Sequence, residues 1–143
     1  MNIIFGSDHA GFDMKEECRL FLEKQDKYRV FDAGVHSRAP SDYPNIAKEV
    51  ALSLSEGRYD RGVLICGSGI GMSITANRYR GVRAALCHNL YLARMCRQHN
   101  DANILVMGGR VIGMGLALEM LMLFLETGFE GGRHRKRLDL IDC

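Results

Sequence analysis

Residues 62–71 read Gly-Val-Leu-Ile-Cys-Gly-Ser-Gly-Ile-Gly, an apolar run that ends at a cysteine and continues into alternating glycines. The apolar run predicts a buried β-strand, and the segment from Gly71 to Arg78 predicts the start of a helix. Alternate glycines permit a tight turn, and the backbone amides at a helix N-terminus can hold an anion or a developing oxyanion. Residues 66–71 are therefore predicted to form an anion-binding turn at the tip of a parallel strand.

The same alternation of strand and helix runs through the whole chain. Apolar strands are expected at 2–6, 28–31, 62–66, 83–87 and 103–107, and helices at 11–25, 44–55, from 71, 90–98 and 113–126. Strands that are apolar throughout are typical of a parallel sheet covered on both faces. We predict a single domain, 1–143, with a three-layer Rossmann-like α/β fold of about five parallel strands, helices on both faces and a C-terminal arm after Gly131.

Composition narrows the class of protein. The chain has 47% apolar and 25% charged residues, and its 19 basic against 17 acidic residues give a formal charge of +2. This charge is too small to indicate a nucleic-acid or membrane partner for the whole molecule. The most apolar run, 111–125, contains Glu119 and is too short to span a bilayer.

The cysteines and the N-terminal residues indicate the cellular compartment of the protein. The five cysteines are an odd number without a CxxC pair, which fits neither a disulfide framework nor a zinc site. The N-terminus has no basic region and meets Asp8 early, unlike a signal peptide. We expect a cytoplasmic protein. The helix predicted at 113–126 is apolar nearly all round, so a homo-oligomeric interface is expected as well.

Cys66 admits two interpretations from the residues alone. A helix N-terminus stabilises a thiolate, so Cys66 can act as an acid or base; equally, it can be a small core residue that ends a strand. Nucleotide-binding loops are excluded because Met72 stands where GxGxxG needs its third glycine and no GKS or GKT occurs. A cysteine phosphatase would need arginine where Met72 lies.

Other polar residues follow predicted strands and helices. Asp8 and His9 come after the first strand, where they can contact a hydroxyl and a phosphate, although Asp8 can also cap the next helix. His99 can be an acid or base, or an exposed helix C-cap. Arg133 and Arg137 are four residues apart and can clamp a phosphate; the alternatives are a solvated tail or a nucleic-acid patch.

Seven ordered motifs together resemble the ribose-5-phosphate isomerase B family, which also holds galactose-6-phosphate isomerase subunits. The resemblance runs from the first strand to the C-terminal arm. The motifs are Phe5–Gly11, Asp42–Pro44, Cys66–Gly71, Ala76–Asn77, Arg97–Asn103, Gly108–Arg110 and Glu130–His134.

The resemblance implies an aldose–ketose isomerase of the pentose phosphate pathway that interconverts ribose 5-phosphate and ribulose 5-phosphate through an enediolate, without a metal or other cofactor. It makes Cys66 the base, with Ser68 beside it, and gives His99 the opening of the furanose ring. It implies that backbone amides hold the enediolate oxygen, in the segment Gly67, Ser68, Gly69, Ile70 and Gly71. The implied contacts to the sugar are Asp8, His9, Tyr43 and Asn100, and those to the phosphate are Arg110, Arg133 and Arg137.

The resemblance also implies a homodimer, or a dimer of dimers, whose active site is shared between subunits. The partner is a small sugar phosphate, with no nucleic acid and no membrane. Two other functions stay open: isomerisation of a six-carbon sugar phosphate such as galactose or allose 6-phosphate, and a non-catalytic module that binds a sugar phosphate or nucleic acid.

Overall fold

A single parallel sheet organises the chain in the computed structural model, which describes residues 1–142. Its five strands have the order β2-β1-β3-β5-β4. The strands are β1 (Asn2–Ser7), β2 (Arg29–Asp32), β3 (Arg61–Cys66), β4 (Ala84–Leu86) and β5 (Ile104–Gly108). The predicted Rossmann-like α/β fold is confirmed.

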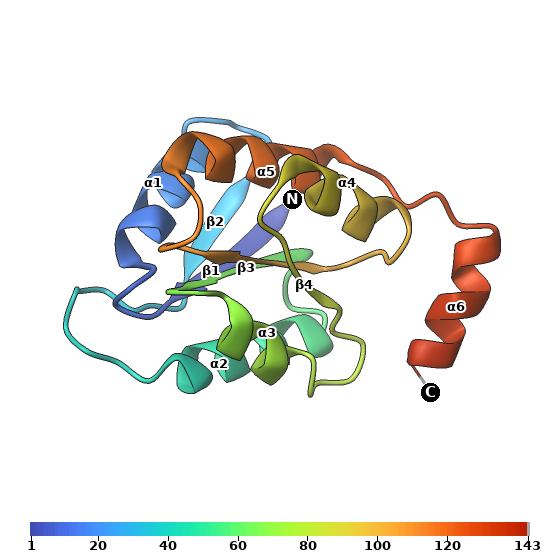
Figure 1. Ribbon diagram of the computed structural model, residues 1–143, viewed down its shortest axis with the longest axis horizontal. Coiled ribbons are helices and arrows are strands. Elements are labelled where there is room, and N and C mark those ends of the chain that lie inside the picture. Colours follow the sequence, from blue (N-terminus) through green and yellow to red (C-terminus); the bar gives the residue numbers. More distant parts are fainter. Residues whose placement is uncertain (143) are drawn as a thin grey trace.

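Helices cover both faces of the sheet (Figure 1). One face carries α1 (Phe12–Glu23), α4 (Leu90–Gln98) and α5 (Met114–Glu126), and the other carries α2 (Tyr43–Ser55) and α3 (Ile70–Ala76). Each face has its own apolar core: Phe5, Val63 and Phe124 belong to the first, whereas Ile4 and Leu64 belong to the second. Successive residues of a strand point to opposite faces, so the fully apolar strands feed both cores at once. No helix within residues 1–142 is long and apolar enough to cross a membrane.

The strand order places a topological switch point between β1 and β3. The chain leaves β1 for β2 on one side and returns to β3 on the other, so the carboxyl ends of β1 and β3 flank a crevice. Ser7 pairs with Ile65, and Cys66 pairs with Gly108 of β5. The Asp8 segment and the glycine turn after Cys66 therefore leave the sheet side by side.

The predicted element ends differ from the structure by a few residues. The strand expected at 83–87 is only Ala84–Leu86, and its residues are half-buried because β4 is an edge strand with one free side. The helix expected from Gly71 begins at Ile70. Helix α5 is partly covered by α1 and α4, but Leu118 and Met122 stay half-buried beside a groove of about 550 Å³.

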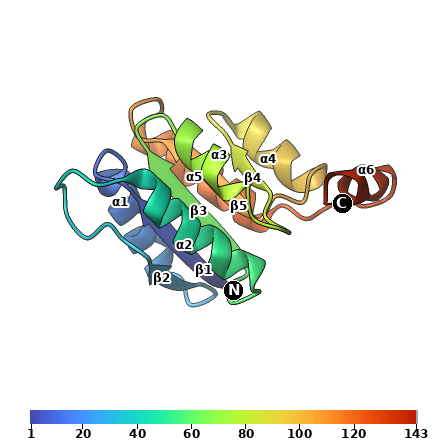
Figure 2. The same ribbon diagram turned by 90° about the horizontal axis from the view of Figure 1, so that it is seen from below.

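The predicted C-terminal arm is a helix, α6 (Arg133–Ile141), that lies beyond the β4 side of the sheet (Figures 1 and 2). Only His134 and Leu138 of this helix are buried. At its far end, Asp142 forms an ion pair of 2.6 Å with Arg83, which precedes β4. The arm is thus attached to the amino edge of the sheet. Cys143 lies outside the described residues.

Candidate functional site

The turn after Cys66 forms as predicted, between the end of β3 and the start of α3. Gly69 has φ +80°, a left-handed conformation that residues with a Cβ rarely adopt. This conformation lets the backbone amide of Gly69 donate a hydrogen bond of 3.1 Å to Sγ of Cys66. An amide aimed at sulfur stabilises negative charge there, and Cys66 is buried, which keeps bulk water away.

Neighbouring backbone groups complete this end of the turn. The hydroxyl of Ser68 accepts a hydrogen bond of 3.2 Å from the amide of Ile70, the first residue of α3, so Ser68 stabilises the turn that leads into this helix. The amide of Gly109 donates to the Cys66 carbonyl (2.8 Å), and that of Arg110 donates to the Gly67 carbonyl (3.0 Å). The exposed Arg110 therefore lies directly beside the turn.

Asp8 stabilises the adjacent turn rather than capping a helix. Its Oδ1 accepts hydrogen bonds from the amides of Ala10 (2.9 Å) and Gly11 (3.0 Å), and Gly11 is the N-cap residue of α1. The Asp8 amide donates to the carbonyl of Ile65, the residue before Cys66. Asp8 is buried, and its Oδ2 makes no hydrogen bond within residues 1–142. This oxygen is available to a ligand hydroxyl.

The loop before α2 contributes two more side chains. The amide of His9 donates to Oγ of Ser41, and the amide of Ser41 donates to Nδ1 of His9, both at 3.2 Å. A Cβ on Gly71 would overlap the Tyr43 ring, which shows that this ring packs against the start of α3. His9 and Tyr43 thus lie with Cys66 at the carboxyl edge of the sheet. Ser41 belongs to no sequence motif that reveals this contact, because its partner His9 is 32 residues away.

Lys15 is a buried residue that also lies outside the predicted site. Its Nζ contacts both carboxylate oxygens of Asp32 at 2.7 Å and the Val35 carbonyl at 2.8 Å. These bonds attach the loop that leads to Ser41 to helix α1. The sequence does indicate that Lys15 is buried, since it has the helical spacing of the buried Cys18 and Leu22 and so lies on the same face of α1.

Four predicted site residues lie elsewhere within the chain. His99 is the C-cap of α4, and the carbonyl of Asn100 accepts a hydrogen bond of 3.0 Å from Arg83, which precedes β4. Both therefore lie at the amino edge of the sheet, whereas Cys66 lies at the carboxyl edge. The six residues of β3 alone span roughly 16 Å between these edges. Arg133 and Arg137 are on α6, beyond the same amino edge.

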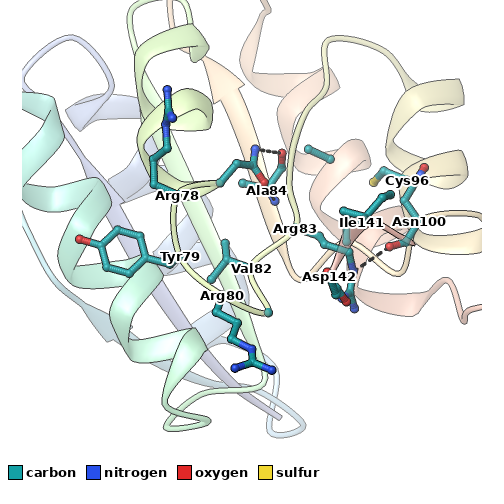
Figure 3. Close-up of a pocket in the computed structure, with 14 residues that line it drawn as sticks. Arg78, Tyr79, Arg80, Val82, Arg83, Ala84, Cys96, Asn100, Ile141 and Asp142 are labelled. Atoms are coloured by element: carbon teal, nitrogen blue, oxygen red, sulfur yellow. Dashed lines mark hydrogen bonds and ion pairs between the residues drawn. The ribbon is translucent and has the colours of Figure 1, made fainter. Parts of the chain in front are cut away.

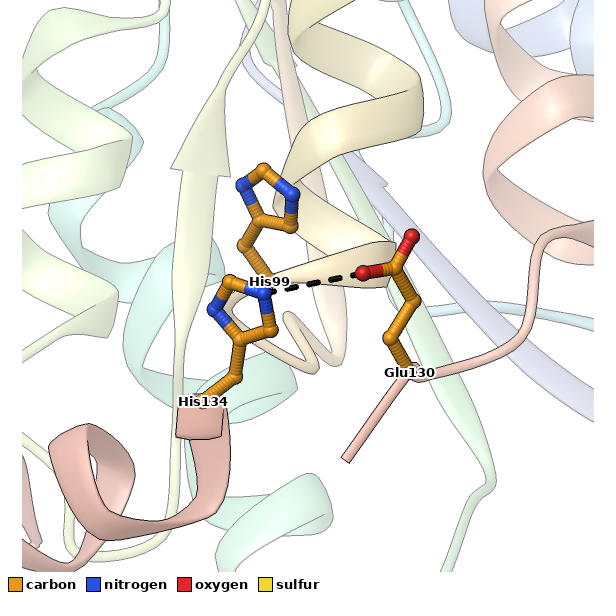
Figure 4. Close-up of side chains that lie close together, drawn as sticks. All are labelled: His99, Glu130 and His134. Atoms are coloured by element: carbon orange, nitrogen blue, oxygen red, sulfur yellow. Dashed lines mark ion pairs between the residues drawn. The ribbon is translucent and has the colours of Figure 1, made fainter. Parts of the chain in front are cut away.

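The amino-edge group has its own geometry. The rings of His99 and His134 stack with centroids 4.2 Å apart and planes 12° apart, and Glu130 faces them (Figure 4). Burial and the neighbouring His99 lower the pKa of His134. Arg133 and Arg137 are exposed, and neither guanidinium has a partner within residues 1–142.

A pocket of about 770 Å³ also lies on the amino-edge side, between the segment 77–85 and the C-terminal end of α6 (Figure 3). Arg78, Arg80 and Arg83 line it together with Val82 and Ile141. Asn100 is the only predicted site residue in its lining, and the turn after Cys66 is not part of it. One chain therefore holds two separated groups of predicted site residues.

Comparison with known proteins gives one consistent family. The ribose/galactose isomerase family model matches residues 3–141. The chain is 44% identical over 139 residues to ribose-5-phosphate isomerase B of Escherichia coli, covering 97% of this chain and 93% of that protein.

Solved structures agree with the family match. The ribose-5-phosphate isomerase B of Clostridium thermocellum superposes with a TM-score of 0.97 at 48% identity, covering 99% of this chain and 95% of that one. The Mycoplasma genitalium enzyme, solved with bound ribulose 5-phosphate, has a TM-score of 0.94 at 36% identity and covers 99% and 93%. The fold and the length of the chain are those of these isomerases.

Proposed function

We propose that the chain, which belongs to the ribose/galactose isomerase family, interconverts ribose 5-phosphate and ribulose 5-phosphate. The observation that carries this proposal is the Gly69 amide aimed at the Cys66 sulfur, at the switch point of the sheet. This combination offers a base and oxyanion donors at one place, which are the two needs of a proton transfer next to a carbonyl. We place this activity in the pentose phosphate pathway of the cytoplasm.

In the proposed mechanism, the Cys66 thiolate removes the proton from C2 of the open-chain aldose. The electron pair moves onto the C1 oxygen and leaves an enediolate, whose charge the amides of residues 67–71 hold. The thiol then returns the proton to C1, and transfer of the C2 hydroxyl proton to the C1 oxygen completes the ketose. The amides act mainly on the charge that develops during the step, so they lower its barrier.

Asp8, His9 and Tyr43 support the assignment because they surround the same crevice. The free Oδ2 of Asp8 suits a sugar hydroxyl. Arg110, beside the Gly67 carbonyl, can attract the phosphate from this side. The hydroxyl of Ser68 already accepts a hydrogen bond from the Ile70 amide, so its role is to hold the turn in shape.

The separation of the two residue groups supports a homodimer, or a dimer of dimers, with shared sites. The length of the strands separates the amino-edge group from Cys66 of the same chain, so this group cannot act on a substrate there. The group consists of His99, Asn100, Arg133 and Arg137. A second copy can bring its amino edge to the Cys66 crevice. We propose that His99 then opens the furanose ring while both arginines hold the phosphate.

A direct assay tests the function. Purified protein should convert ribose 5-phosphate to ribulose 5-phosphate, and Cys66→Ala should lower kcat by about 10²–10⁴-fold. Ribose 5-phosphate should have the highest kcat/KM in a panel with galactose 6-phosphate and allose 6-phosphate. A folded wild-type protein without isomerase activity on any of the three would refute the proposal and favour a non-catalytic binding module.

Mixing two inactive variants tests the shared site. Cys66→Ala and His99→Ala should each be inactive alone, yet a mixed dimer has one site with both intact residues. Random pairing makes half of the dimers mixed, so co-expressed chains should regain about one quarter of wild-type activity. No recovery in dimers shown to contain both variants would mean that each site is built from one chain.

A further inference from the structure

We propose that His99, Glu130 and His134 bind a divalent transition-metal ion, for which Zn²⁺ is the natural probe. Their potential ligand atoms all lie within 4.8 Å of one another. They are the only group of three histidine, cysteine or carboxylate ligands at such distances within residues 1–142. Figure 4 shows the two imidazoles side by side with the Glu130 carboxylate facing them.

The three ligands come from different segments that the backbone ties together. The amide of Glu130 donates a hydrogen bond of 3.0 Å to the carbonyl of Gln98, next to His99. The amide of His134 donates to the Gly131 carbonyl at 3.0 Å, in the first turn of α6. The positions of the three residues are therefore defined by main-chain contacts and do not depend on an ion.

The ring nitrogens are free to take a ligand. Within the described chain, their one recorded polar contact is the 3.6 Å approach of His134 Nε2 to Glu130 Oε2. That distance is too long for a good hydrogen bond. Two imidazoles with poorly used nitrogens and a nearby carboxylate therefore provide three donors that no other group occupies.

Two histidines and one carboxylate form a well-known zinc ligand set, and they leave a fourth position for water. Bonds of about 2.1 Å at tetrahedral angles put ligand atoms about 3.4 Å apart, so the group must contract by about 1.4 Å. Glu130 can move because its side chain is half-exposed and lies in the irregular connection between α5 and α6. The same exposure gives an ion access from solvent. The imidazoles of His99 and His134 must also rotate out of their stack, because nitrogen lone pairs lie in the ring planes and planes only 12° apart do not converge on one ion.

The neighbouring charges determine how tightly the site binds a metal ion. Arg133 and Arg137 stand on the same arm and repel a cation, while Glu130 is the one carboxylate in the group. We therefore infer weak, reversible binding that a chelator removes. If the proposed function holds, the bound ion occupies the lone pair that His99 needs for ring opening, so the metal is an inhibitor of the isomerase.

Metal binding is tested without any activity measurement. Calorimetric titration of the full-length protein with Zn²⁺ should show one ion per chain. Glu130→Gln and His134→Gln should each weaken binding about tenfold or more. The matched control Glu126→Gln, which alters an exposed carboxylate paired with Lys27, should bind as the wild type does. Binding that is absent, or equal in Glu130→Gln and the control, overturns the proposal.

Cysteines are the competing ligands, and Co²⁺ distinguishes them. The wild-type Co²⁺ spectrum should lack a thiolate charge-transfer band, and Cys66→Ser should keep both the spectrum and the affinity. A thiolate band, or loss of binding in Cys66→Ser, places the ion at the glycine turn and overturns the assignment to His99, Glu130 and His134.

The inhibitory role needs a separate measurement. Zn²⁺ should abolish wild-type turnover, and EDTA should restore it. Glu130→Gln should keep wild-type turnover without metal and should need about tenfold more Zn²⁺ for the same inhibition. Equal inhibition of both proteins overturns the inhibitory role. If the wild type has no isomerase activity at all, the proposed function and this role fail together, whereas the binding titrations still decide the site.

Discussion

The backbone amide of Gly69 donates a hydrogen bond of 3.1 Å to the sulfur of Cys66. The two residues are three apart, and the amide reaches the sulfur only because Gly69 adopts φ +80°. The glycine therefore aims a partial positive charge at the residue that we propose as the base. A substitution that changes the backbone conformation of Gly69 should therefore affect both the stability of the protein and the proposed proton transfer.

Gly69→Ala should lower both stability and turnover. A Cβ would be strained by about 1–2 kcal/mol at this φ, and it would also lie 2.5 Å from Leu86 Cδ1 and 3.1 Å from the Met107 backbone. The amide would then move away from the Cys66 sulfur. We expect kcat to fall at least about tenfold, as for other lost oxyanion donors. Urea denaturation and steady-state kinetics measure the two effects.

Gly81→Ala is the matched control, since Gly81 has φ +74° but nothing within 4 Å of an added Cβ. It should show the strain alone, with unchanged kcat. If both variants lose the same stability and both keep full turnover, the close packing around Gly69 has no role in the reaction.

Lys15→Met should destabilise the protein strongly. The Lys15 side chain is fully buried, so its removal leaves Asp32, whose side chain is 19% exposed, with only more distant cations. Breaking such a buried pair costs about 3 kcal/mol. The free energy of unfolding from urea titration is the measurement.

Lys27→Met is the comparison, because Lys27 forms an exposed ion pair with Glu126. Exposed pairs contribute little, so this variant should unfold at nearly the wild-type urea concentration. Equal midpoints for the two methionine variants would show that Lys15 does not anchor the loop of residues 33–42.

Arg133→Ala and Arg137→Ala should each raise KM for ribose 5-phosphate by about 10-fold or more, because a charge-assisted phosphate contact is lost. Both should also reduce the preference for the phosphorylated sugar over free ribose. Initial rates over a range of both sugars measure these changes. Unaltered KM in both variants would contradict phosphate binding by the arm.

Arg135→Ala is the control on the same helix. The guanidinium of Arg135 lies over the Phe129 ring, 4.9 Å from its centroid. Arg135 is therefore on the opposite side of the helix from Arg133 and Arg137, which share one face. Its KM should match the wild type. A rise equal to that of Arg133→Ala would indicate a general effect of the arm's charge.

Cys18 should resist alkylation in the folded protein. Burial raises the pKa of its thiol from 9.0 to about 12, so the thiolate fraction stays low until pH approaches 12. Stability contributed by the protonated thiol is complete below pH 9 and is lost between pH 9 and 12, because the unfolded chain releases the proton first.

Iodoacetamide labelling at pH 9, followed by peptide mass spectrometry, measures this resistance. In urea, Cys18 should react as a free cysteine does. Equal labelling rates with and without urea would show that the α1 face opens in the native protein.

Local patterns predicted much of the site. The apolar run before Cys66 and the glycines after it specify a strand, a turn and a helix over ten residues, so short-range chemistry alone forms the turn that we propose as the oxyanion site. Asp8 was predicted as a cap for the next helix or a ligand contact. It does not cap the helix but holds the turn before the N-cap Gly11, since its carboxylate reaches amides two and three residues ahead, and its contact with a ligand stays a prediction.

Contacts between distant segments were less predictable. The pairing of His9 with Ser41 and of Lys15 with Asp32 depends on the path of the loop after β2, which has no periodic pattern. Helical spacing put Lys15 on a buried face, but spacing does not reveal which carboxylate compensates its charge. The stacking of His99 on His134 likewise depends on how the arm folds back.

The sequence by itself determined the parallel α/β fold, the turn at Cys66 and the family, because these follow from residues close together in the chain or from ordered motifs. Only the tertiary structure decided which site residues meet. In a parallel sheet all strands end at one edge, and the helices that connect them end at the other. Cys66, at the end of β3, and His99, at the end of α4, therefore lie at opposite edges. A linear order of motifs contains no such distance, and it therefore could not show that one chain holds two separated groups of predicted site residues.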